Sequence, residues 1–176
     1  MKEAFTRKSL LILGRGIGQV MFQNNALSGL LMLIGIFLNS WQMGLLAVSG
    51  NIISTSTGRI SGYDRDDIKN GLYGFNGTLV GIAVGVFMLL TVSSLMLMAI
   101  ASCASTYIAR FFNMQRMLPG FTTPFILSVW MLLGLCSWLM PDMLLVSDTE
   151  TPASSSINYL QCFSMGIGQV MLQGNM

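Results

Sequence analysis

The chain has 176 residues, of which 53% are hydrophobic and only 9% are charged, and its mean hydropathy is +0.67. A soluble domain of this size could not carry that composition without exposing large apolar patches, so the composition indicates an integral membrane protein, and its long uncharged stretches predict an all-α one. The net charge is only +2, and the basic residues flank apolar stretches instead of forming a patch, which argues against a nucleic-acid partner.

Charged residues are absent from residues 16–58, 70–109 and 117–141. Each of these stretches can hold one or two of the roughly 20-residue helices that cross a membrane. The segment before them, Lys2–Lys8 followed by Leu10–Leu13, has the basic and apolar look of a signal peptide. Because its apolar run is short and no small-residue cleavage site follows, we expect it to be retained.

The first apolar stretch, residues 16–57, predicts two crossings that turn near Asn39–Gln42. The connection that follows, Gly58–Asn70, is rich in Lys and Arg, as is the amino terminus. Basic segments favour the cytoplasmic side, so both are expected there.

Residues 71–109 predict two further crossings, and they return the chain to a basic cytoplasmic loop at Arg110–Arg116. Residues 124–140 predict a fifth crossing. The acidic, Ser-rich segment after it contains no Lys or Arg, as expected of an external loop. These assignments divide the chain into a membrane unit at residues 1–141, an external linker at 142–163 and a last segment at 164–176.

The decapeptide Gly16–Asn25 returns with two changes as Gly166–Asn175. An odd number of crossings between two copies of a motif means that the copies start from opposite faces of the membrane. This is the pattern of an inverted-topology repeat, which many solute carriers share. We expect one full repeat and the truncated start of a second.

The segment Asn70–Gly81 interrupts its apolar character with Asn76 and four glycines after Asn70. Glycine disfavours an uninterrupted helix, so one interpretation is a short re-entrant pore helix that breaks near Asn76 and lines a wet cavity. The alternative is close helix packing through small residues, since the segment and Gly85 after it contain four-residue glycine spacings.

The apolar stretches contain no acidic residue, the chain has no His, and no nucleophile or phosphate-binding motif is present. An enzyme, a metal site and a bound cofactor are therefore not expected. Cys103, Cys136 and Cys162 lack a C-x-x-C spacing, so we interpret them as packing residues.

The polar residues left in the apolar stretches are neutral, and they suit a neutral polar solute. Taken singly, an Asn or Thr in a membrane more often joins helices than contacts a substrate. Gln19 is the exception, because Gln169 repeats it and inverted symmetry would bring the two together near the midplane.

Three separate motifs, Gly18–Phe22 with Asn25, Gly71–Gly81 and Leu118–Phe125, closely resemble the urea transporter family of the bacterial type in order and spacing. The resemblance covers the first half of a family member and the start of its second half. It implies channel-like facilitated diffusion of urea by a homotrimer in the lipid bilayer, with one pore in each protomer. It also implies a fold of two inverted repeats, each with five crossings and a pore helix.

The resemblance further implies roles for matched residues. An aromatic slot would take the flat urea molecule, an apolar wall would flank it, and oxygen ladders would meet its amide hydrogens. The implied positions are Phe22 and Phe75 at the slot, Val20 and Leu79 on the wall, Gln19 and Gln169 on the ladder, Thr122 at the constriction, and Gly74, Asn76, Gly77 and Thr78 in the pore-helix motif. Leu172 stands where some relatives have a second-repeat Phe.

Two alternatives stay open at this point. The chain could be a truncated, non-conducting membrane fragment of a urea transporter, because a pore at the interface of two repeats does not close with one. It could also be a channel for another small neutral amide, which would use the same residues.

Overall fold

A computed structural model describes residues 2–115 and 120–145, and every named element in these ranges is a helix. Two of them are single 3₁₀ turns, η1 and η2. In chain order the elements are α1 Lys2–Gly18, η1 Gln19–Met21, α2 Ala26–Asn39, α3 Trp41–Ile60, α4 Arg65–Lys69, α5 Gly74–Phe87, α6 Val92–Gln115, α7 Thr123–Leu139 and η2 Pro141–Met143.

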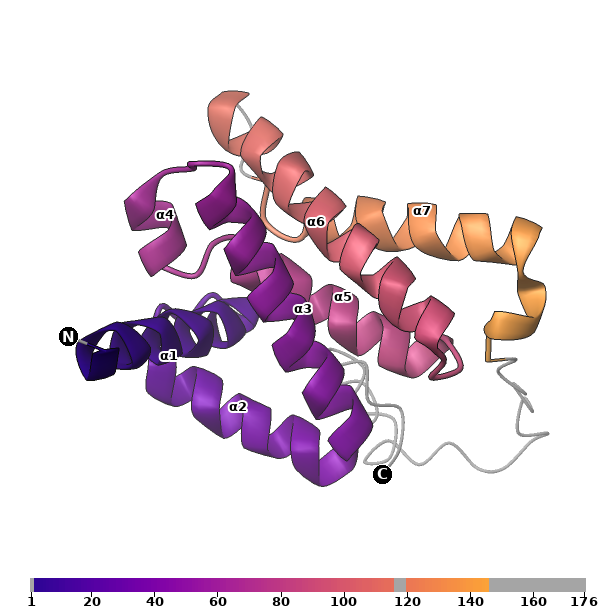
Figure 1. The fold of residues 1–176 in the computed structure, drawn as a ribbon, viewed down its shortest axis with the longest axis horizontal. Coiled ribbons are helices and arrows are strands. Elements are labelled where there is room, and N and C mark those ends of the chain that lie inside the picture. The colour runs from indigo at the N-terminus through magenta and orange to yellow at the C-terminus, as the bar shows by residue number, and fades with distance from the viewer. Residues whose placement is uncertain (1, 116–119, 146–176) are drawn as a thin grey trace, which may run out of the picture.

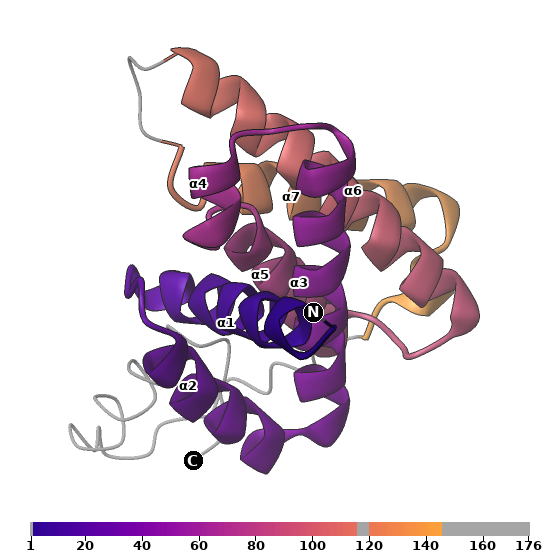
Figure 2. The same ribbon diagram turned by 60° about the vertical axis from the view of Figure 1, so that its left-hand side comes forward.

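Helices α3 and α5 pack side by side at the centre of the molecule. The pair α1 and α2 lies on one side of them and the pair α6 and α7 on the other (Figure 1). Helix α5 contacts α1, α6 and α7, and α3 contacts α1, α2, α4 and α6, so the central pair together touches every other α-helix (Figure 2).

Glycines allow α3 and α5 to approach closely. A Cβ atom added to Gly50 would meet the carbonyl oxygen of Gly77, and one added to Gly81 would meet the carbonyl oxygen of Leu46. Side chains at these positions would force the helix backbones apart. The small-residue packing that was one interpretation of the glycine-rich segment is therefore confirmed.

Of the other interpretation, the expected break near Asn76 is wrong. Helix α5 begins at Gly74 and continues through Asn76 to Phe87. The interruption lies earlier, in the turn at residues 70–73, where Gly71 adopts a left-handed φ of 76° and rests against Gly16 of α1. With 14 residues α5 is about 21 Å long, which is shorter than the hydrocarbon core of a bilayer.

A buried polar network joins α1, α3 and α5. The Asn51 side chain, which is fully buried, donates to the carbonyl of Leu13 at 3.1 Å and to the Thr78 hydroxyl at 3.0 Å. Its own carbonyl accepts from the Thr55 hydroxyl at 3.2 Å, and Thr78 donates to the carbonyl of Gly74 at 3.0 Å. Both the nitrogen and the oxygen of the Asn51 carboxamide form hydrogen bonds, so the network fixes the register of α1, α3 and α5 relative to one another.

Apolar packing fills the rest of the interface between the central helices and α6 and α7. The largest buried cluster includes Leu46, Val80, Met98 and Cys136. Cys136 is a free cysteine inside this core, and Cys103 is half-buried with its Sγ atom 3.3 Å from the Thr57 hydroxyl, as expected of packing residues. Cys162 lies outside the described residues.

One described helix, α6, is by itself long and apolar enough to cross a membrane. A second candidate is the bent pair of residues 8–21 and 26–39, which turn by 74°. The sequence predicted five crossings, so the described ranges contain fewer full spans than expected. The reason is that α5 and α7 are apolar but short, while α3 carries buried polar residues.

Several expected boundaries hold and others do not. The predicted turn near Asn39–Gln42 is confirmed by the break at Ser40, and the predicted helix at residues 124–140 is α7. Two helices do share residues 71–109. The first apolar stretch, however, begins inside α1. The predicted loop at Arg110–Arg116 is also not a loop as far as Gln115, since α6 continues through Arg110 to that residue.

Candidate functional site

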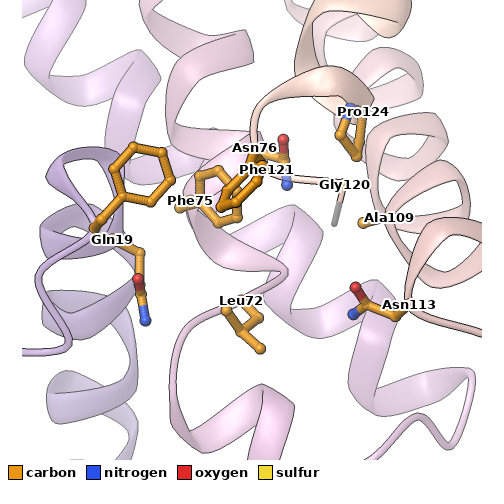
Figure 3. Close-up of a pocket in the computed structure, with 10 residues that line it drawn as sticks. Gln19, Leu72, Phe75, Asn76, Ala109, Asn113, Gly120, Phe121 and Pro124 are labelled. Carbon is orange, nitrogen blue, oxygen red and sulfur yellow. The ribbon is translucent and has the colours of Figure 1, made fainter. Parts of the chain in front are cut away.

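A cavity of about 240 Å³ lies where η1, the first turn of α5, the end of α6 and the start of α7 meet (Figure 3). Gln19 and Asn113 lie on opposite sides of it in this view, with Leu72 between them. Its described lining consists of Gln19, Phe22, Leu72, Phe75, Asn76, Ala109, Asn113, Gly120, Phe121 and Pro124.

Local hydrogen bonds hold η1 against the turn that leads into α5. The half-buried Gln19 side chain donates to the carbonyl of Asn70 at 3.1 Å, and the Asn24 amide donates to the Asn70 side-chain oxygen at 3.1 Å. The Asn25 side chain then caps α2 by accepting from the Leu27 N–H group at 2.9 Å. These contacts leave the side-chain oxygen of Gln19 as an acceptor beside the cavity.

Two aromatic rings from distant parts of the chain meet at the cavity. The ring centroids of Phe22 and Phe121 are 5.6 Å apart, and the ring planes cross at 87°, which is the edge-to-face arrangement that aromatic pairs favour. Both residues adopt positive φ angles, 55° and 38°, which are uncommon for residues other than glycine. The rings are 61% and 58% exposed, while Phe75 beside them is buried.

Asn76 connects α5 to the start of α7. Its side-chain oxygen accepts from the backbone N–H group of Phe125 at 3.1 Å, which satisfies one of the free donors in the first turn of α7. Asn76 is almost fully buried, yet it lines the cavity, and its amide nitrogen lies on the cavity side of the side chain (Figure 3). The residue therefore offers a donor to the cavity while its oxygen is engaged.

The electrostatic character of the cavity is neutral, because none of the described residues that line it is charged. Charged groups gather instead around α4. There the half-buried carboxyl of Asp67 accepts from the Tyr73 hydroxyl at 3.4 Å. Burial, followed by the nearby charge of Asp64, raises the pKa of Asp67 above its ordinary value.

The cavity brings together four of the residues that the sequence singled out, namely Gln19, Phe22, Phe75 and Asn76. Val20, Leu79 and Thr122 are half-buried and are not part of its described lining, although Gly120, Phe121 and Pro124 around Thr122 are. Gly74, Gly77 and Thr78 are buried, on α5, and form the contacts with α3 described above. Gln169 and Leu172 lie outside the described residues.

Sequence reasoning missed Leu72, Asn113 and Phe121 as lining residues. Leu72 and Phe121 lie within motifs that resemble the family, so their place in those motifs was an available signal. No signal in the sequence indicated Asn113, because it lies in a segment that was predicted to be a loop. It reaches the cavity because α6 continues as far as Gln115.

Comparisons with known proteins agree with these observations. The family model for the urea transporter matches residues 10–176. Similar curated relatives are urea transporter 1 of Ovis aries, 30% identical over 174 residues, and of Rattus norvegicus, 31% identical over 172 residues. In each comparison the match covers 89% of this chain and 44% of the relative, so the chain spans less than half the length of these relatives. The chain belongs to the urea transporter family, whose members are membrane proteins.

Proposed function

We propose that this chain conducts urea across the membrane, down its concentration gradient, through a pathway that includes the cavity at η1, α5, α6 and α7. The observation that carries the proposal is the described lining, which combines aromatic rings with neutral amides and lacks charged side chains. An ion entering such a cavity would lose its hydration without compensation, whereas a planar, uncharged solute would not.

Urea has two flat faces, four N–H donors and one carbonyl acceptor, and the cavity offers aromatic rings, a side-chain acceptor and a side-chain donor. The rings of Phe22, Phe75 and Phe121 contact the flat faces. The side-chain oxygen of Gln19 accepts from an N–H group of urea, and the amide of Asn76 donates to the urea carbonyl. The volume of about 240 Å³ is below the range of roughly 300–1,000 Å³ for drug-sized ligands, which favours a small solute.

Weak binding is compatible with rapid passage. Each hydrogen bond contributes only about 1 kcal/mol net, so a few of them correspond to roughly millimolar binding, near 4 kcal/mol. A solute held at this strength leaves quickly, which a conducting pathway requires.

The finer parts of the proposal rest on the resemblance and on the topology argued from charge. They place Val20 and Leu79 on the apolar wall, Thr122 at the constriction and Gln169 on the opposite ladder. They also include inverted repeats, a homotrimer and a cytoplasmic amino terminus in the inner membrane. Because the chain spans 44% of its relatives, its activity as a unit is part of the proposal too.

The experiment that tests the proposal measures solute selectivity. Stopped-flow light scattering would follow the entry of urea, acetamide and formamide into proteoliposomes that contain the chain, with empty vesicles as the baseline. We expect urea to enter faster than acetamide, because its second NH₂ group supplies donors that acetamide lacks. Equal enhancement of all three amides would instead favour a channel for small neutral amides in general.

A further inference from the structure

A second candidate site is a groove between α1, α3 and α4, on which basic side chains converge. It has a volume of about 540 Å³, and every charged residue in its described lining is basic. We call it the basic groove, and its charged residues are Lys8, Arg15, Arg59, Arg65 and Lys69.

Among the described residues, only Lys69 of these five has a carboxylate partner, and the other four charges are not neutralised by an ion pair. Lys69 forms an ion pair with Asp66 at 2.8 Å, and an Arg15 Nη atom donates to the Lys69 carbonyl at 3.2 Å. Lys8, Arg59 and Arg65 are exposed and form neither an ion pair nor a side-chain hydrogen bond within the part of the chain that the structure describes. Like charges that surround one groove repel one another, so an anion bound there would be stabilised.

The nearby carboxylates do not supply that anion. Asp64 is occupied as the cap of α4, where it accepts from the N–H groups of Asp66 and Asp67 at 2.8 and 3.1 Å. Asp67 accepts from the Tyr73 hydroxyl. Neither Asp64 nor Asp67 is part of the lining of the basic groove.

An apolar groove of about 400 Å³ adjoins the basic groove, and Leu11 of α1 lines both. This second groove lies between α1, α2 and α3, and its described lining contains only apolar residues. Two of them, Leu10 and Leu30, are 63% and 51% exposed. A cationic groove and an apolar groove thus share one wall residue, Leu11.

We propose that the two grooves together bind one anionic phospholipid, with its phosphate in the basic groove and an acyl chain in the apolar groove. A free phosphate ion would leave the apolar groove unused, and a zwitterionic lipid would leave the cationic charge only partly compensated. Basic pockets between the helices of membrane proteins bind acidic head groups in this way. The inference depends on the membrane setting of the family and not on urea conduction.

The test is native mass spectrometry of the full chain in detergent, with dioleoylphosphatidylglycerol and dioleoylphosphatidylcholine added in equal amounts. We expect the wild-type chain to retain the anionic lipid preferentially. The triple variant K8Q/R59Q/R65Q should lose that preference by at least about tenfold, which corresponds to roughly 1.4 kcal/mol. The matched variant K8R/R59K/R65K keeps every charge and should retain the preference.

The apolar half of the site has its own matched pair of variants. Leu30→Gln changes a residue that lines the apolar groove and is 51% exposed, whereas Leu31→Gln changes a neighbour outside the groove that is 63% exposed. Only Leu30→Gln should weaken retention of the anionic lipid. Equal retention of both lipids, an unchanged preference in K8Q/R59Q/R65Q, or complete displacement by millimolar inorganic phosphate would overturn the proposal.

Discussion

Replacing Gly81 by Ala tests whether the close approach of α3 and α5 determines the stability of this fold. A Cβ atom at this position would meet the Leu46 carbonyl oxygen, would lie 2.5 Å from the carbonyl carbon and would lie 2.9 Å from the Ala47 nitrogen. All three are backbone atoms of α3, so no side-chain rotation can relieve the contact, and the two helices must separate.

The expected cost follows from these contacts. Overpacking a well-packed interior costs about 1–3 kcal/mol, and the higher helix propensity of Ala offsets up to about 1 kcal/mol of that. Because the obstructing atoms are backbone, we expect a net loss of about 2 kcal/mol. For a chain of this length that corresponds to a fall of roughly 4–8 °C in the unfolding midpoint.

The assay is thermal unfolding of the purified chain in detergent, followed by far-ultraviolet circular dichroism. Gly35→Ala on α2 is the matched control, since a Cβ atom there would meet nothing within 4 Å. It should leave the midpoint unchanged or raise it, because Ala favours the helix. If Gly81→Ala were tolerated as well as Gly35→Ala, the reasoning about α3 and α5 would be refuted.

Three further predictions concern buried polar groups. Asn51→Ala should cost about 1–3 kcal/mol in unfolding free energy, because the Leu13 carbonyl loses its bond to the Asn51 side chain; a loss no larger than that of Asn39→Ala would contradict this. Asn76→Ala should lower the unfolding midpoint, since the Phe125 N–H group loses its acceptor, and should also slow urea entry; unchanged flux would remove Asn76 from the pathway. The raised pKa of Asp67 means that the folded state binds its proton more tightly than the unfolded chain, so ionisation costs stability as pH rises above about 3.8. Asp67→Asn removes this cost, so the midpoint at pH 7 minus the midpoint at pH 4 should be higher in the variant than in wild type, and an unchanged value would show that Asp67 does not titrate in this way.

Local signals predicted the parts of the fold that depend on neighbouring residues. The polar cluster around Ser40 ends one helix and begins another, with Ser40 accepting from the Met43 N–H group at 3.3 Å. Pro124 lies in the first turn of α7, where its missing N–H group is tolerated. The glycine spacing on α5 favoured close helix packing as one of two interpretations, and the contacts of Gly50 and Gly81 with the facing helix backbone confirm it.

Other features depend on contacts between distant segments and could not be predicted from local patterns. Segmentation by charge placed residues 2–15 outside the predicted crossings, although α1 extends through them and brings Lys8 to the basic groove. The meeting of Phe22 with Phe121, and of Asn76 with Phe125, joins residues far apart in sequence. These contacts form because α5 and α7 converge beside η1, which no pattern within one segment indicates.

Urea flux through the Phe22→Ala variant is the most direct test of the central claim. Phe111→Ala is its matched control, because Phe111 is 57% exposed and contacts Phe112 edge-to-face as Phe22 contacts Phe121, yet it does not line the cavity. Stopped-flow light scattering of proteoliposomes should show rapid urea entry for the wild-type chain and for Phe111→Ala, and much slower entry for Phe22→Ala. Urea entry no faster than in empty vesicles for a wild-type chain with verified insertion, or equal flux in all three proteins, would contradict the account.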